Sequence, residues 1–263
     1  MNIKEYIRQL QSYEVYAFNY NELCSKTNKT PAAIKNELSR LSAKNEIFNL
    51  RKEFYVIFPP QYAVRQYLPL QFYVDKLFSF LQKPYYVGLF SAAKFYGAAH
   101  QQLQTDYIIT TPPPLAEIKK KSFHIKFFTA SRWPSKNIRK MKSDAGFFRI
   151  SSPALTIADL IHYQTKLGGI NRIFTVIKEL TGEVTAKDLE ELLEWYPYVS
   201  TLQRFGFLLE KSGAGKSLVD SLKNHLEQRK LYPVLLSPSA KKRSGKTANF
   251  WKVIENTKLE SDL

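Results

Sequence analysis

The spacing of apolar residues changes along this 263-residue chain, and these changes restrict its fold more than any other feature. Residues 1–45 and 152–228 place apolar side chains three or four positions apart, which is the spacing of amphipathic helices. Residues 104–151 instead contain short strand-like runs bounded by proline, glycine and serine. Helices at the start, strands in the middle and helices again at the end predict an α+β fold.

The first sixty residues have the order of elements of a winged helix-turn-helix. Apolar stripes predict helices in residues 2–13, 19–28 and 30–45. Two apolar runs that alternate around a charged turn predict a β-hairpin in residues 46–58. Helix, short helix, helix and hairpin is the winged helix-turn-helix arrangement, so residues 1–60 are predicted to form a DNA-binding domain.

The third helix is the predicted recognition helix. Thr30 is its expected N-cap and Pro31 its first residue. Ile34, Leu38 and Leu41 give the buried stripe, which leaves small and amide side chains on the opposite face.

Small and amide side chains suit a face that enters the major groove, because the backbone can approach and an amide can bond to base edges. Cations at the margins and at the hairpin tip suit phosphates. The alternative is a small structural domain that binds protein. The predicted DNA-contacting residues are Lys29, Thr30, Lys35, Asn36, Ser39, Arg40, Lys44, Arg51 and Lys52.

The positive charge is concentrated in the middle of the chain. The formal net charge is +16, and residues 61–150 alone contain 14 basic and 4 acidic side chains, a net of +10. Such an excess is typical of a protein that binds a polyanion, although a solvated basic surface is the alternative. The residues predicted to form a second nucleic-acid or antitoxin surface are Lys119, Lys120, Lys121, Lys126, Arg139, Lys140 and Lys142.

The remaining 203 residues, 61–263, are predicted to form one α/β domain with a basic, strand-containing part and a helical part. The basic part, 61–150, is expected to begin with helices at 70–81 and after Pro84 and to continue with strands. Its three consecutive prolines, 112–114, are expected to exclude regular structure from residues 112–121. The helical part, 151–263, is expected to contain five helices and a strand-like tail at 249–256.

The stretch "KSGAGKS" at Lys211–Ser217 resembles the end of a phosphate-binding loop. The first glycine of that pattern would fall at Glu210, whose carboxylate repels phosphate, and no predicted strand precedes it. We therefore expect a connector between two helices, with Ser217 capping the second helix.

Catalytic and metal-binding patterns are missing from the sequence, and no cofactor is expected. The four histidines, among them His100, lack metal-ligand spacing, and the single cysteine Cys24 cannot build a zinc site. Asp106 and Asp144 leave a metal-dependent nuclease as a weaker alternative to a non-enzymatic binder. One cysteine fits a reducing cytoplasm, and neither a signal peptide nor a membrane span is visible.

Several segments together resemble the AbiEi family, the antitoxins and transcriptional regulators of type IV toxin–antitoxin systems involved in abortive infection. They follow the predicted winged helix in the family's order: "YYVGLFSAAKFYG", "SSPALTIADLIHY", "GGINRIFTVIKEL", "TLQRFGFLLE", "YPVLLSP" and "NFWKVIEN".

The resemblance implies a repressor and antitoxin with two parts. The winged helix would bind inverted repeats in its own promoter, and the C-terminal region would counteract a nucleotidyltransferase-type toxin without having to bind it. The alternative is a solitary winged-helix regulator with a ligand-sensing or nucleic-acid-binding C-terminal domain.

Overall fold

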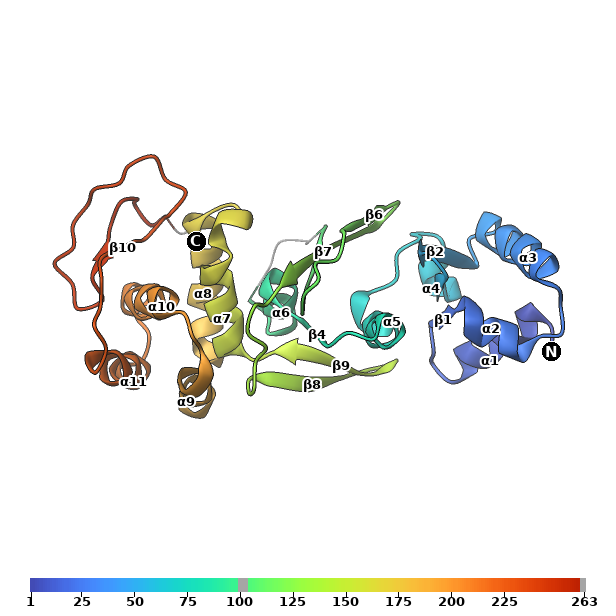
Figure 1. Cartoon of the computed structure of the whole chain (residues 1–263), viewed down its shortest axis with the longest axis horizontal. Coiled ribbons are helices and arrows are strands. Elements are labelled where there is room, and N and C mark those ends of the chain that lie inside the picture. The colour runs from blue at the N-terminus through green and yellow to red at the C-terminus, as the bar shows by residue number, and fades with distance from the viewer. Residues whose placement is uncertain (99–103, 261–263) are drawn as a thin grey trace. The chain divides into compact units, whose positions relative to one another are not determined.

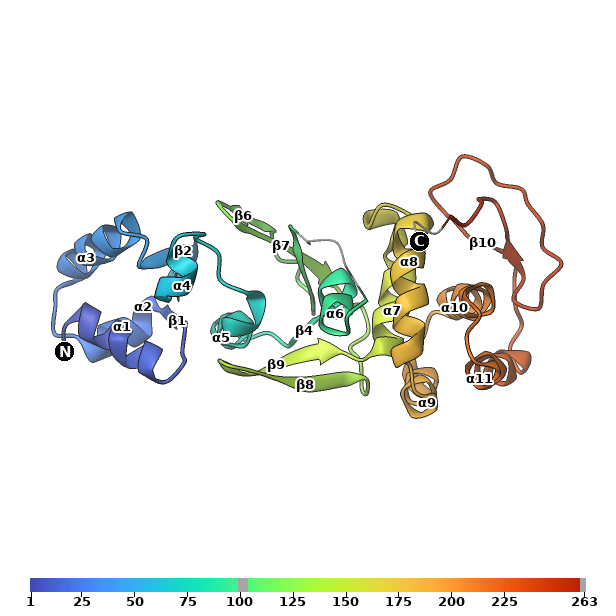
Figure 2. The same cartoon turned by 180° about the vertical axis from the view of Figure 1, so that it is seen from behind.

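The computed structural model describes residues 1–98 and 104–260, and it is a mixed α+β protein as the sequence predicts (Figure 1, Figure 2). The chain divides into two compact units. Unit 1 comprises Met1–Tyr86, Gln104–Ser131 and Lys140–Arg149. Unit 2 comprises Val87–Leu103, Arg132–Arg139 and Ile150–Leu263. Unit 1 therefore contains the first sixty residues together with much of the strand region that follows them.

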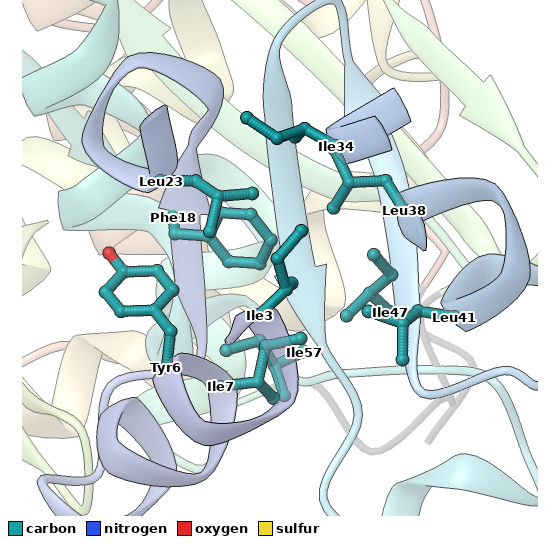
Figure 3. Close-up of a cluster of buried hydrophobic side chains, with 10 residues drawn as sticks. All are labelled: Ile3, Tyr6, Ile7, Phe18, Leu23, Ile34, Leu38, Leu41, Ile47 and Ile57. Carbon is teal, nitrogen blue, oxygen red and sulfur yellow. The ribbon is translucent and has the colours of Figure 1, made fainter. Parts of the chain in front are cut away.

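Unit 1 begins with three helices and a three-stranded sheet. The elements are α1 Ile3–Ser12, β1 Ala17–Asn19, α2 Tyr20–Lys26, α3 Pro31–Ala43, β2 Ile47–Arg51 and β3 Phe54–Ile57. β3 lies between β1 and β2 and is antiparallel to both. Ile3 and Ile7 of α1, Leu38 of α3 and Ile57 of β3 belong to one buried cluster, so the helices cover one face of this sheet (Figure 3).

Polar caps determine where these helices begin. Asn2 and Glu5 form a capping box at α1, and Asn19 and Glu22 form one at α2. Thr30 caps α3 as predicted, because its hydroxyl oxygen accepts a backbone N–H at 3.4 Å. The short strand β1 was not predicted from the sequence.

The segment after β3 differs in two places from the sequence prediction, and the first is that the helix predicted at 70–81 begins only at Val74, after a 3₁₀ turn. Its elements are α4 Pro60–Ala63, the 3₁₀ turn η1 Leu70–Phe72, α5 Val74–Leu81, β4 Tyr85–Val87 and α6 Leu89–Phe95. The prediction of a helix directly after Pro84 is wrong, because the bulky residues Tyr85–Val87 form a fully buried strand and the helix begins only after Gly88. The end of the predicted helix, with His100, lies outside the described residues.

A six-stranded sheet has the order β6-β7-β5-β4-β9-β8. Its further strands are β5 Asp106–Thr110, β6 Ile118–Lys120, β7 Phe123–Thr129, β8 Ile138–Ser143 and β9 Gly146–Ser151. β7 is parallel to β5 and antiparallel to β6. The predicted strands are present, but β6 contradicts the expectation that residues 112–121 are irregular, since the prolines end at Pro114 and leave the following residues free to pair.

Unit 2 is mostly helical, as predicted. Its helices after α6 are α7 Pro153–His162, η2 Gln164–Lys166, α8 Ile170–Leu180, η3 Thr181–Glu183, α9 Ala186–Trp195, α10 Val199–Ser212 and α11 Lys216–Glu227. Two short parallel strands, β10 Val234–Leu235 and β11 Val253–Ile254, follow. Within the described ranges, no helix is both long and apolar enough to cross a membrane.

The segment "KSGAGKS" connects α10 to α11, as the sequence predicts. Gly213 ends α10 in the left-handed conformation with φ +74°, which glycine adopts at little cost. The prediction that Ser217 caps α11 is wrong, because the helix begins at Lys216, before Ser217, and Gly215 is its N-cap.

Candidate nucleic-acid interface

Helix α3 presents a polar face opposite its buried stripe. Ile34, Leu38 and Leu41 are buried, as the spacing predicts. Asn36 and Ser39 are exposed on the opposite side, and the small residues of that side leave room for close approach. Three further exposed residues of the predicted set carry positive charge around this face, namely Lys35, Arg40 and Lys44.

Two residues at the start of α3 have partners within the protein. Lys29 forms an ion pair with Glu37, and the hydroxyl oxygen of Thr30 is the N-cap acceptor. Lys29 is 39% exposed, so this surface pair contributes little stability and can open. Lys35 and Arg40 are therefore better suited than Lys29 to meet a phosphate.

The hairpin between β2 and β3 turns through Lys52 and Glu53. Arg51 pairs with Phe54 in the register, and Lys52 is exposed at the tip. The backbone oxygen of Glu53 accepts the N–H of Tyr20 at 2.8 Å, which joins the turn to α2. The two cations at the tip are consequently held at a defined place beside the helices.

The second face of the three-stranded sheet is also covered. Phe48 of β2 and Phe58, which follows β3, point away from the helices, since their neighbours Ile47 and Ile57 belong to the cluster beneath the helices. Phe123 of β7 packs on this second face, with its ring 5.2 Å from that of Phe48 and 6.1 Å from that of Phe58. The predicted alternation in "FYVIF" is therefore wrong, because β3 buries residues on both faces.

The tip of the β6–β7 hairpin lies against β2 and carries three of the predicted lysines. Lys120 Nζ donates a hydrogen bond to the backbone oxygen of Asn49 in β2, at 3.4 Å. Lys121 Nζ donates to Gln66 at 3.0 Å and lies 5.6 Å from the centre of the Phe48 ring. Lys119 is exposed, whereas Lys126 in the middle of β7 is half-buried.

The predicted residues of β8 lie in both units. Lys140 and Lys142 are exposed in unit 1. Arg139 belongs to unit 2, where its guanidinium is 3.3 Å from the buried carboxylate of Asp188. That carboxylate also accepts the side-chain amide of Asn137 at 2.9 Å and the N–H of Ala154, the second residue of α7, at 2.8 Å. Arg139 thus helps to neutralise a structural carboxylate in unit 2.

The two aspartates that a metal-dependent nuclease would use lie on or directly after strands that are not neighbours in the sheet. Asp106 begins β5 and Asp144 follows β8, and in the sheet β4 and β9 lie between these two strands. In the part of the chain that the structure describes, no group of three or more His, Cys, Asp or Glu residues could hold a metal ion. His124 instead shares a hydrogen bond of 2.9 Å with Thr105.

The comparison with protein families identifies the part of the chain from α6 to α10. Residues 86–211 match the family of AbiEi antitoxin C-terminal domains. The chain is a relative of the AbiEi antitoxins. The β6–β7 hairpin, the Asp188 network and the helices α6 to α10 all lie in this AbiEi domain.

The fold has a counterpart among solved structures. The chain is similar to the RV2827C protein from Mycobacterium tuberculosis, with a TM-score of 0.66 and 14% sequence identity. The match covers 95% of this chain and 90% of the mycobacterial one, so the likeness includes the N-terminal elements as well as the AbiEi domain. No curated protein matches the sequence.

Proposed function

We propose that this AbiEi relative is a DNA-binding transcriptional repressor and the antitoxin of a type IV toxin–antitoxin operon. The AbiEi domain indicates an antitoxin role. The order α1-β1-α2-α3-β2-β3 supports a winged helix in the N-terminal part, with β2 and β3 as the wing. The observation that carries the DNA-binding role is the exposed face of α3, which has amide and hydroxyl groups in its middle and cations at its margins.

In this proposal, α3 enters the major groove of duplex DNA. Asn36 and Ser39 face base edges, and an asparagine amide can bond to adenine through two hydrogen bonds. Lys35 and Arg40 meet phosphates on the two sides of the groove, and Arg51 and Lys52 of the wing meet the backbone next to it. Phosphate contacts fix the position of the helix, and the amide supplies the sequence preference.

The duplex is expected to be the protein's own promoter with inverted repeats, and the antitoxin partner a nucleotidyltransferase-type toxin of the same operon. A type IV antitoxin counteracts its toxin without having to bind it. The two functions are therefore expected to depend on different surfaces.

A pair of variants tests this division. Lys35→Gln with Arg40→Gln should abolish repression of a reporter behind the gene's own upstream region, yet still protect cells that express the toxin. Lys178→Gln with Lys187→Gln removes two exposed cations of α8 and α9 and serves as the matched control, which should leave repression intact. Unchanged repression in the α3 variant would show that α3 is not the DNA-reading element.

A further inference from the structure

A pocket in unit 1 is lined both by N-terminal elements and by a hairpin of the AbiEi domain. Its volume is about 210 Å³, which is the space of roughly seven water molecules. Three segments line it: residues 14–17 lead into β1, residues within 71–79 belong to η1 and α5, and Ala145 and Phe147 belong to the β8–β9 hairpin. In Figure 1 and Figure 2, α5 lies beside β1 and the tip of this hairpin. We call this space the β1 pocket.

The buried residues of the β1 pocket are firmly packed. Ala17 and Tyr73 are each 1% exposed, and the ring of Tyr73 meets that of Phe123 edge-on, with centroids 5.9 Å apart. Phe123 is itself 1% exposed. The ring of Phe72 meets that of Tyr16 in the same way, at 5.4 Å. Because these rings hold one another in preferred arrangements, the pocket is a preformed space, which is typical of small-molecule sites.

Aromatic rings give the β1 pocket an apolar surface that also suits cations. Tyr16, Phe72 and Phe147 line the pocket, and Phe147 is 60% exposed. A large exposed ring beside a pocket is apolar surface that a ligand can cover. The face of an aromatic ring is negative and attracts a cation within about 6 Å of its centre. A ligand with an apolar body and a positive charge therefore matches these rings.

The cation of the β1 pocket is already neutralised by the protein. Among the described residues that line the pocket, Lys76 is the single cation, and its Nζ is 2.6 Å from a carboxylate oxygen of Glu22. Asp75 is engaged as well, since it accepts the hydroxyl of Tyr85 at 3.0 Å and lies 3.6 Å from the guanidinium of Arg149. Both charged groups are thus held by other side chains of unit 1.

Two carboxylates at the β1 pocket have no such partner. Within residues 1–98 and 104–260, neither Glu14 nor Asp144, the neighbour of Ala145, forms an ion pair. Burial raises the pKa of the Tyr16 hydroxyl above its ordinary value, and the nearby carboxylates of Glu14 and Asp144 raise it further. The uncompensated charge beside Tyr16 is therefore negative, and the complementary ligand is a cation.

The segment that lines the β1 pocket is joined directly to the proposed wing. The backbone oxygen of Tyr16 accepts the N–H of Ile57 in β3 at 2.8 Å, and Ala17 pairs with Val56 in the register. β1 then ends at Asn19, which caps α2. A ligand that contacts residues 14–17 consequently contacts a segment that is hydrogen-bonded to β3 and leads into α2.

We propose that the β1 pocket binds a small organic cation, an amine with an apolar body, and that this ligand is an effector that strengthens DNA binding. Glu14 and Asp144 receive the ammonium group, and the rings of the pocket cover the apolar body. The ligand strengthens DNA binding because it fixes the segment that leads into β1 and because it neutralises carboxylates that repel phosphates. The effector role rests on the proposed function, whereas the binding site does not.

Three probes with the same ring and different charge test the binding site. Phenethylamine is positive at neutral pH, phenethyl alcohol is neutral and hydrocinnamate is negative. Each is titrated into the isotope-labelled full-length protein, and the amide signals of residues 14–17, 71–79 and 145–147 are followed by NMR. Phenethylamine should shift these signals and bind at least about 5-fold more tightly than the alcohol, since a partly exposed ion pair contributes up to about that factor. Hydrocinnamate should bind more weakly than the alcohol.

Matched variants assign the charge preference to the two carboxylates. Glu14→Gln combined with Asp144→Asn should lower the affinity for phenethylamine to that for phenethyl alcohol. Glu46→Gln combined with Glu117→Gln is the control, because it removes two carboxylates of unit 1 that do not line the pocket, and it should keep the wild-type preference. Thermal unfolding checks that both double variants are folded.

The effector role is tested with the same probes and the duplex of the protein's own upstream region. Phenethylamine should raise the affinity of the wild type for this duplex by at least about 5-fold, which is the lower end of typical coupling between two sites. It should not raise the affinity of the Glu14→Gln, Asp144→Asn variant. That comparison separates the effect at the pocket from any binding of the amine to phosphates.

The outcomes separate this inference from the proposed function. Absent shifts at the pocket, or hydrocinnamate that binds as tightly as phenethylamine, overturn the binding site. Pocket binding with an unchanged affinity for DNA, in a wild type that prefers its own duplex, overturns the effector role and leaves the repressor proposal intact. Pocket binding in a wild type that has no sequence preference supports the site and overturns the repressor proposal.

Discussion

The rings of Phe48 in β2 and Phe123 in β7 stack in parallel, with centroids 5.2 Å apart and 11° between their planes. The two residues are 75 positions apart in the sequence, yet they join the N-terminal sheet to the AbiEi domain inside one compact unit. One face of the N-terminal sheet thus carries α3, the helix proposed to read DNA, and the other face packs against part of the AbiEi domain. This contact gives a physical route by which a change in one part can affect the other.

Removal of the Phe123 ring should destabilise unit 1. Phe123→Ala is expected to lower the free energy of unfolding by about 3–5 kcal/mol, because the ring is fully enclosed and its removal leaves a cavity. Phe147→Ala is the matched control, since Phe147 is 60% exposed and should change stability little. The free energy of unfolding of both variants is measured by chemical denaturation. An equal decrease in the two variants would contradict the role given to Phe123.

Asn36→Ala should reduce sequence preference rather than overall affinity for DNA. If the amide bonds to a base through two hydrogen bonds, the difference in binding free energy between the specific and the scrambled duplex should decrease by about 1–3 kcal/mol. The slope of log K against the logarithm of the salt concentration should stay unchanged, because no phosphate contact is lost. Asn224→Ala, an exposed asparagine of α11, is the control in the same binding titration. An unchanged difference in binding free energy would exclude Asn36 as a base-reading residue.

Gly206 lets the C-terminal segment pack on α10. A Cβ atom at this position would lie 2.1 Å from the indole ring of Trp251, which is fully buried. Gly206→Ala should destabilise unit 2 by about 1–3 kcal/mol through overpacking, although alanine favours the helix by about 1 kcal/mol. The near-ultraviolet circular dichroism of Trp251 should change as well. Gly182→Ala, where a Cβ has open space, should leave stability and spectrum almost unchanged.

The Asp188 carboxylate should be essential for the packing of unit 2. Asp188→Ala leaves the N–H of Ala154 without its acceptor, and a buried donor left unpaired costs about 1–3 kcal/mol. It also removes one of the two acceptors of the Asn137 amide, which keeps its bond to the backbone oxygen of residue 188. Glu190→Ala alters an exposed carboxylate of the same helix and is the matched control. A similar melting temperature for the two variants would contradict the structural role of Asp188.

Stability should fall as the pH is lowered through the range in which histidine titrates. Burial, with nearby Lys166 and Arg204, lowers the pKa of His162, and burial with Arg229 lowers that of His225. The unfolded chain then binds more protons than the folded chain below the ordinary histidine pKa of about 6.5, so the free energy of unfolding decreases with falling pH.

His162→Phe keeps a ring to stack on Tyr198, 4.3 Å from the histidine ring, and removes the titrating group. This variant should lose less stability than the wild type between about pH 7.5 and about pH 5. An identical pH dependence would assign the whole effect to His225 or to the carboxylates.

The sequence predicts the elements of this fold whose periodicity is strong and local. The cap of α3, its buried stripe at Ile34, Leu38 and Leu41, and the helices of unit 2 all follow from apolar spacing and capping residues. The sequence does not distinguish the strand β4 from the start of a helix, because three buried aromatic and β-branched residues have no period that separates strand from helix.

The contact between Phe48 and Phe123 could not be derived from spacing, because it joins segments that are far apart in the chain. One signal was nevertheless present. The run "FYVIF" at residues 54–58 is apolar throughout, and a strand buried on both faces has this composition, whereas a wing with one solvated face alternates. The ion pair between Arg139 and Asp188 could not be predicted for the same reason, since the two residues are 49 positions apart in the sequence.

The central claim, that this AbiEi relative represses its own operon through α3, is tested most directly by one binding measurement. The full-length protein is titrated by fluorescence anisotropy against a labelled duplex of its own upstream region and against a scrambled duplex of equal length, at one fixed physiological salt concentration. The account predicts that the upstream duplex binds at least about 10³-fold more tightly, which is the lower end for specific protein–DNA recognition. Equal affinity for the two duplexes would contradict it.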